Sequence, residues 1–216
     1  MSRKVRETKK NFKVFCEGDT EYNYIDEMRR QKRFSIALKQ VNMKGGGYSN
    51  FLGQIKTDGT ANCLAKFIII DGDRAVTDAR EKKHLQELLE YCLLQNKSGR
   101  IPHFLIVDYP DFEYIACLHT PKYKNQNIPQ YIIRELGYRN IEEFKADDKI
   151  YNVLNTNGNS SDLMLSLLRK DNQFITNNFS IKKNVYEIKV STIYDWEKLG
   201  IRSSNINEFF EVISSF

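Results

Sequence analysis

Apolar and polar residues follow two different patterns along the first half of the chain. Short apolar segments bounded by turn residues are typical of strands, whereas apolar residues at i, i+3, i+4 and i+7 are typical of amphipathic helices. Strands are predicted at four segments: 11–16, 34–43, 66–70 and 102–107. Helices are predicted at three segments between them: from Thr20 onward, over 49–56 with Ser49 or Asn50 as the cap, and from Thr77 onward.

The order of these segments predicts the fold class. Strands separated by segments of helical length imply βαβ crossovers, which give a parallel sheet with helices on both faces. Residues 67–70 are continuously apolar, as expected of a strand that is buried on both faces. We therefore predict an α/β fold, with ligands expected at the carboxyl ends of the strands.

The pattern of the second half is weaker. It predicts mostly helical segments at 131–136, 141–144, 163–168 and 206–213, a polar loop at 155–161 and a late strand near 185–190. We find no internal repeat. We predict three regions: a basic arm at 1–10, an α/β core at 11–120, and a mostly helical extension at 121–216 that packs on the core.

The positive charge is concentrated at the N-terminus. The chain carries a net charge of +5, and its first thirteen residues contain six basic residues and one acidic residue. A basic arm of this kind adds salt-dependent attraction to phosphates, and it is equally typical of a solvated leader. The charge therefore permits a nucleic-acid partner without identifying one.

Several classes of protein are disfavoured by the composition. No apolar run is longer than five residues, far short of the ~20 residues that span a bilayer, and no apolar stretch of signal-peptide length follows the basic N-terminus. The four cysteines are irregularly spaced, which favours buried filler in a reducing compartment. We expect a folded cytoplasmic protein with no membrane partner.

Acidic residues follow two of the predicted strands. Asp71 and Asp73 come directly after one strand, and Glu17 ends another, with Glu21 four residues later. Closely spaced carboxylates raise one another's pKa unless a cation lies between them, and a set without His or Cys suits Mg²⁺ or Mn²⁺. The alternatives are an Asx-type turn for Asp71 and Asp73, and a favourable charge at a helix start for Glu21.

Three stretches resemble known motifs. Residues 15–21, Phe-Cys-Glu-Gly-Asp-Thr-Glu, followed by Tyr24, are similar to the segment that opens the Toprim domain of OLD-like and RloB-like proteins. Residues 68–73 resemble the Asp-x-Asp strand of the same domain. Residues 108–119, which contain Pro110, Phe112 and Glu113 and end in His119, resemble the RloB signature, except that Tyr109 replaces its Asn. Together these matches cover about half of the chain.

The resemblance implies a Toprim-like, Rossmann-like parallel sheet and roles for individual residues. It implies that Glu17 is a metal ligand or general acid/base, that Asp71 and Asp73 are metal ligands, and that Glu21 is a second-site ligand. Glu113 would complete the acidic cluster. His119, which follows a predicted strand over 114–118, would act on the leaving group or contact phosphate; the alternative for this residue is a structural hydrogen-bonding role.

The function implied by the resemblance is Mg²⁺- or Mn²⁺-dependent cleavage of nucleic acid. The substrate would be RNA such as tRNA, or DNA, and the setting antiphage defence beside an ABC-type ATPase or within a homo-oligomer. Two alternatives remain: nucleotidyl transfer or nucleotide processing at the same metal site, and a non-catalytic partner subunit of the ATPase. Lys44, Lys122 and Lys124 are candidate contacts for the nucleic-acid backbone, and solvated loops explain them equally well.

Overall fold

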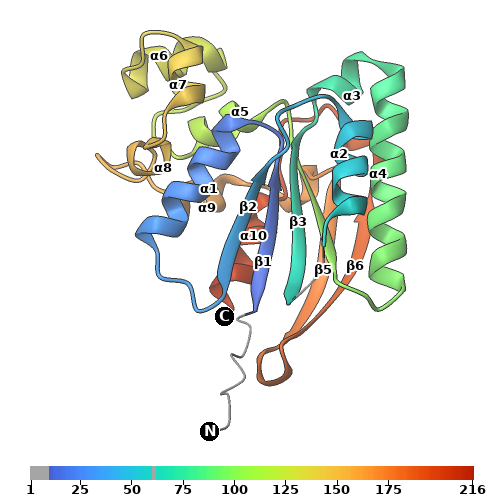
Figure 1. The fold of residues 1–216 in the computed structure, drawn as a ribbon. Helices are drawn as coiled ribbons and strands as arrows, with labels where there is room; N and C mark the ends of the chain where they lie inside the picture. Colours follow the sequence, from blue (N-terminus) through green and yellow to red (C-terminus); the bar gives the residue numbers. More distant parts are fainter. Residues whose placement is uncertain (1–9, 60–61) are drawn as a thin grey trace, which may run out of the picture.

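The computed structural model describes residues 10–59 and 62–216, and its centre is a four-stranded parallel sheet (Figure 1). The sheet has the strand order β2-β1-β3-β4. The predicted α/β class and all four predicted strands are confirmed: β1 (Asn11–Cys16), β2 (Ala37–Asn42), β3 (Cys63–Asp71) and β4 (His103–Asp108). The predicted basic arm lies, apart from Lys10, outside the described residues.

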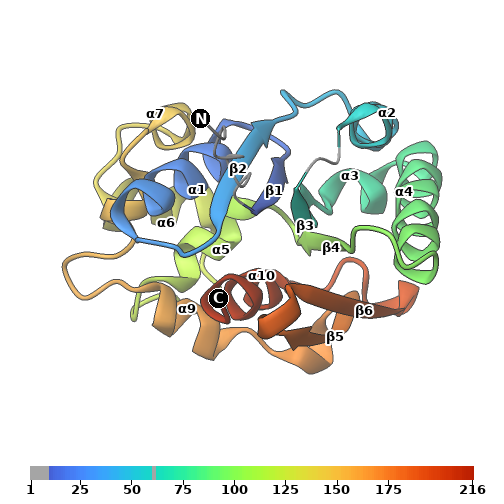
Figure 2. The same cartoon turned by 60° about the horizontal axis from the view of Figure 1, so that its bottom comes forward.

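Helices cover both faces of the sheet, because successive side chains of a buried strand point to opposite faces. On β3, Phe67 and Ile69 pack in one apolar cluster, whereas Ile68 and Ile70 pack in the other. The first cluster lies against α1 (Asp19–Gln31), and the second against α2 (Tyr48–Thr57) and α4 (Ala79–Lys97). Figure 2 shows these two helical layers on either side of the strands.

Two helix starts differ from the prediction. The residue before α2 is Gly47, with φ at 83°, so neither Ser49 nor Asn50 caps that helix. A short helix, α3 (Asp73–Thr77), precedes α4, and the Asp78 side chain accepts a hydrogen bond from the Arg80 backbone N–H at 2.7 Å. The long helix therefore begins after Asp78 rather than at Thr77.

The strand predicted over 114–118 is wrong, because this segment belongs to a helix, α5 (Phe112–Leu118). Asp111 starts this helix by accepting a hydrogen bond from the Tyr114 backbone N–H at 3.2 Å. Every residue of α5 is buried. A helix that is buried on all sides is continuously apolar, and its sequence pattern therefore resembles that of a buried strand.

The second half contains short helices and an antiparallel hairpin. The helices are α6 (Ile128–Leu136), α7 (Ile141–Ala146), α8 (Ile150–Val153), α9 (Ser161–Leu167) and α10 (Ile206–Ser214), with three 3₁₀ turns at Lys170–Asn172, Lys183–Val185 and Trp196–Lys198. The hairpin joins β5 (Ile175–Lys182) to β6 (Glu187–Tyr194). The predicted late strand overlaps β6, but the sequence pattern missed β5, whose centre is polar.

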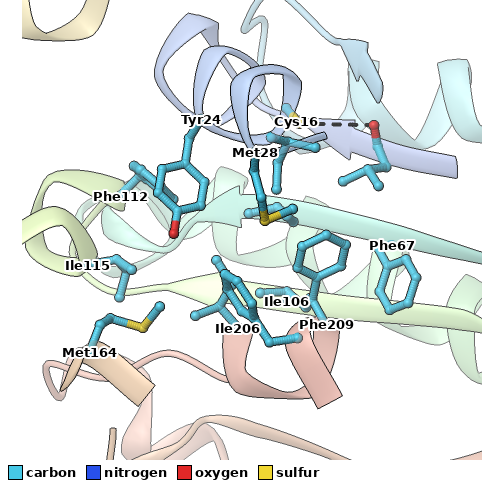
Figure 3. Packing of buried hydrophobic residues seen from close by; sticks show 14 of the residues in the cluster. Cys16, Tyr24, Met28, Phe67, Ile106, Phe112, Ile115, Met164, Ile206 and Phe209 are labelled. Carbon is cyan, nitrogen blue, oxygen red and sulfur yellow. Dashed lines mark hydrogen bonds between the residues drawn. The ribbon is translucent and has the colours of Figure 1, made fainter. Parts of the chain in front are cut away.

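Helix α10 closes the core beneath the sheet (Figure 3). The ring of Phe209 lies 5.1 Å from the ring of Phe67 on β3, in an edge-to-face arrangement. Ile206 joins the same cluster, which extends to Tyr24 on α1 and Phe112 on α5. The extension is thus part of one core with the sheet.

Two further predictions concern cysteine and membrane segments. All four cysteines, Cys16, Cys63, Cys92 and Cys117, are buried as free thiols, as predicted. Within residues 10–59 and 62–216, no helix has the length and apolar character needed to cross a bilayer.

Candidate functional site

Three neighbouring strands end in acidic residues at the same edge of the sheet. Glu17 follows β1, Asp71 ends β3 and Asp108 ends β4, and Asp71 and Asp108 are direct partners in the strand register. Backbone hydrogen bonds keep these ends together: the Glu17 N–H donates to the Ile69 carbonyl at 3.1 Å, and the Gly72 N–H donates to the Asp108 carbonyl at 2.8 Å. Parallel register therefore brings carboxylates from distant parts of the sequence to one place.

Four of the predicted acidic residues line one small cavity of about 150 Å³ at this edge. Glu17 and Asp71 come from the strand ends, Glu21 from the first turn of α1, and Glu113 from the first turn of α5. Glu17, Glu21 and Glu113 are buried, and Asp71 is partly exposed. Lys145 of α7 is also part of the lining.

Backbone N–H groups orient three of these carboxylates. Glu17 Oε2 accepts from the Asp71 N–H at 2.9 Å, and Asp71 Oδ1 accepts from the Phe112 N–H at 3.0 Å. Glu21 Oε2 accepts from the Gly18 N–H at 3.2 Å, which is one half of a capping box at the start of α1. Each carboxylate is therefore held through one oxygen.

Burial and mutual repulsion raise the pKa values of the cluster. The pKa of Asp71 is well above its ordinary value, first because of burial and then because of the carboxylates of Glu21 and Glu17. The pKa of Glu21 is raised to about 8 by burial and by Glu113 and Glu17. Burial also raises the pKa of Glu17. The cavity thus favours a compensating positive charge over a full set of bare carboxylates.

Lys145 supplies one such charge. Its Nζ lies 3.1 Å from Glu113 Oε1, and the lysine side chain is half exposed. Burial lowers the pKa of Lys145, but the Glu113 carboxylate outweighs this effect and raises it overall. A cation at the edge of an acidic cavity offsets part of its negative charge.

Asp108 and Asp111 extend the acidic character beyond the cavity lining. Asp108 is fully buried, and its Oδ1 accepts a hydrogen bond from Ser204 Oγ at 2.5 Å, whereas Oδ2 has no hydrogen-bond partner among the described residues. The pKa of each aspartate is raised to about 7, first by burial; Glu113 adds to the shift of both. The charge of the site therefore affects the pKa of both aspartates.

The donor set fits a hard divalent cation in its chemistry. Glu17, Glu21 and Asp71 each have a second carboxylate oxygen that the backbone N–H groups do not use, and that of Glu17, Oε1, lies 3.9 Å from Arg74 Nε. Carboxylate oxygens are the ligands that Mg²⁺ prefers. In the part of the chain that the structure describes, no three His, Cys, Asp or Glu side chains are already arranged to hold a metal ion. The side chains would therefore have to move closer together to bind an ion, and the acidic residues that line the cavity are the ones that would do so.

Asp73 lies apart from the other predicted ligands. It is exposed at the first residue of α3, outside the cavity lining, and its Oδ1 accepts from the Arg74 N–H at 2.6 Å. Its charge contributes to the raised pKa of Glu17. Asp73 is thus the first residue of a helical turn next to the cavity and is not part of its lining.

His119 is placed in the core. Its Nδ1 bonds the Ile115 carbonyl at 2.9 Å, and its Nε2 bonds the Tyr24 hydroxyl at 2.9 Å. Because a carbonyl only accepts, Nδ1 carries the proton and Nε2 accepts from the tyrosine. Burial lowers the pKa of His119 to about 4. These contacts correspond to the structural alternative and do not bring the ring to the carboxylate cavity.

The three predicted lysines are exposed and do not line the carboxylate cavity. Lys44 follows β2, where the Gly45 N–H donates to the Glu17 carbonyl at 2.9 Å. Lys122 lies 3.7 Å from Glu135 Oε2. Lys124 lines a different, larger cavity.

Sequence reasoning missed Lys145 and Asp108 as parts of the site. Asp108 ends a buried strand, so the strand-end rule that selected Asp71 also applies to it. Lys145 lies on a short helix far along the chain, and nothing in its local pattern connects it to the carboxylates. Only the packing of α7 near α1 places it there.

The chain was compared with protein-family models, curated protein sequences and solved structures, and none of them matches it.

Proposed function

We propose that the carboxylate cavity is the active site of a divalent-metal-dependent nuclease that cleaves phosphodiester bonds. The observation that supports this proposal is the convergence of Glu17, Glu21, Asp71 and Glu113 from four separate elements at the carboxyl edge of a parallel sheet. This edge is where parallel α/β sheets bind their ligands. The resemblance of the same segments to the Toprim motifs of RloB-like proteins agrees with it.

The residues around the cavity would have different roles in binding the metal ion and the substrate. Glu17, Glu21 and Asp71 would hold a Mg²⁺ or Mn²⁺ ion through the oxygens that the backbone N–H groups do not use, with Arg74 moving off Glu17 Oε1, and Glu113 would extend the acidic set. Lys145 would attract the phosphate to the cavity. When bound, the ion would activate water and neutralise developing charge on the phosphate. Backbone N–H donors fix three of the carboxylates before substrate arrives.

The wider setting is part of the proposal. We propose an RNA substrate such as tRNA, or DNA, and a role as an effector of antiphage defence, in which an ABC-type ATPase or self-assembly controls activity. This setting rests on the resemblance alone. The chemistry of the cavity supports only the metal-dependent reaction.

The test combines metal binding with cleavage. Asp71→Asn and Glu21→Gln are expected to reduce Mn²⁺ affinity at least tenfold by titration calorimetry, because each removes one anionic ligand, and to abolish cleavage of tRNA, single-stranded RNA and plasmid DNA. Asp73→Asn should reduce activity much less, because Asp73 lies outside the lining. Asp162→Asn, an exposed aspartate on α9, is the matched control.

Clear outcomes would contradict the proposal. Equal Mn²⁺ affinity in wild type and Asp71→Asn would remove the metal site, whatever the activity. Metal binding without cleavage, together with transfer of a labelled nucleotide, would replace the nuclease by a nucleotidyl transferase.

A further inference from the structure

A second, larger cavity of about 460 Å³ shares α5 with the carboxylate cavity. Glu113 lines the carboxylate cavity, and the next residue, Tyr114, lines the larger one. Its other walls come from the segment after α5, the end of α9 and the loop before α10. A volume of this size is in the range of about 300–1,000 Å³ that is typical of ligand pockets.

The lining of this cavity is basic. It includes Lys124, Arg169 and Arg202 but no aspartate or glutamate. Nearby Lys122 and Lys170 form ion pairs with glutamates, whereas none of the three lining cations does so within the described residues. Three uncompensated positive charges around one concavity favour an anionic ligand.

The hydrogen-bond partners of Arg202 among the described residues are neutral groups. Its Nη1 donates to the Tyr123 hydroxyl at 3.3 Å and to the Asn125 carbonyl at 3.5 Å. The Tyr123 hydroxyl donates in turn to the Gln126 carbonyl at 3.2 Å, so that its oxygen is directed to accept from the arginine. No carboxylate among the described residues neutralises this guanidinium, and only its Nη1 has hydrogen-bond partners there, so its other N–H groups can bind a phosphate.

Apolar side chains complete the cavity. Leu167 and Ile201 both line it and are 44% and 43% exposed. A ligand that satisfies this surface has an anionic group beside an apolar face, as a nucleotide has in its phosphate and its sugar and base. The volume accepts a unit of this size but is too small for a base-paired duplex.

We propose that this cavity binds a nucleotide unit of single-stranded nucleic acid, with Arg202 and Arg169 on its phosphate. Glu113 and Tyr114 are consecutive residues of α5, so both cavities border this one short helix, and in this proposal the strand passes along the helix from one cavity to the other. The proposal rests on the proposed nuclease function and specifies how its substrate is held.

The test measures binding without cleavage. Fluorescence anisotropy in EDTA would follow a labelled single strand of about 12 nucleotides, as RNA and as DNA, a length within the usual site sizes for single-strand binding. Arg202→Ala and Arg169→Ala are each expected to weaken binding of the better strand about tenfold. Each should also lower the slope of log K against log salt by about 0.7. Arg33→Ala, which removes an exposed arginine from the loop before β2, is the matched control and should change neither quantity.

Unaltered binding by both cavity variants, or losses equal to that of Arg33→Ala, would overturn the proposal. It would also be overturned if a duplex of the same sequence or a free mononucleotide bound as tightly as the single strand. Equal Mn²⁺ affinity in wild type and Asp71→Asn would reject the metal-dependent nuclease function, but it would not affect the binding result, because binding is measured in EDTA. Conversely, a wild type that cleaves while Arg202→Ala binds and cleaves equally would reject this inference alone.

Discussion

Burial decides what individual titratable residues do in this protein. His119 and Glu21 both occur in motif-like stretches, but the first is enclosed by Tyr24 and the Ile115 carbonyl, whereas the second faces a cavity with other carboxylates. Burial therefore gives a neutral histidine in one place and a carboxyl of raised pKa in the other. The same physical effect produces a structural residue and a candidate ligand.

The buried histidine predicts a specific pH dependence. Because the pKa of His119 is lowered from 6.5 to about 4, its contribution to stability is present above pH 6.5 and is lost as the pH falls toward 4. Between pH 7.5 and pH 5 the loss is expected to be about 2 kcal/mol. Urea unfolding at both pH values should show that wild type loses this much more stability than His119→Gln. Equal losses in the two proteins would show that the ring is accessible to protons in the folded state.

At the scale of elements, the outer edge of β4 is covered by side chains rather than by a fifth strand. Asn205 accepts from the Val107 N–H at 2.9 Å and donates to the Leu105 carbonyl at 2.9 Å. Asn177 of β5 donates to the same carbonyl at 3.2 Å, and Glu208 of α10 accepts from both asparagines. The amide groups reproduce the pairing that a neighbouring strand would provide.

Removing the Asn205 side chain from the edge of β4 is expected to lower the stability of the protein. Asn205→Ala leaves the Val107 N–H without its partner and removes two further buried bonds, so the free energy of unfolding should fall by about 3 kcal/mol. Hydrogen exchange of the Val107 amide should accelerate at the same time. Asn178→Ala, at an exposed neighbouring position on β5, should change stability by less than about 0.5 kcal/mol. If Asn205→Ala also changed the free energy of unfolding by less than about 0.5 kcal/mol, water would be replacing the lost hydrogen bonds at no net cost.

At the scale of the whole molecule, the two halves of the chain share one core. Phe209 packs on Phe67 of β3, and the ring of Phe216 lies 5.6 Å from that of Phe12 on β1. Ile206, Val212 and Ile213 of α10 are buried in the same cluster. Residues 121–216 therefore complete the apolar layer on one face of the sheet instead of resting on a finished domain.

This shared core predicts the behaviour of a truncated chain. A fragment ending at residue 120 would expose Phe67 and the outer edge of β4, and it is expected to lack cooperative unfolding. Circular dichroism during heating, with amide NMR dispersion as a second readout, would measure this against the full chain. A sharp thermal transition in the fragment would establish residues 11–120 as an independent domain.

The sequence by itself determined the local features of this protein: the four parallel strands, the α/β class and the carboxylates at the ends of β1 and β3. These follow from short-range apolar patterning and from the rule that parallel strands share their carboxyl edge. Tertiary structure decided which residues meet. Packing made 114–118 part of a fully buried helix, left Asp73 and His119 outside the cavity lining, and added Lys145 to that lining. Such contacts depend on packing between distant segments, and a local pattern does not encode them.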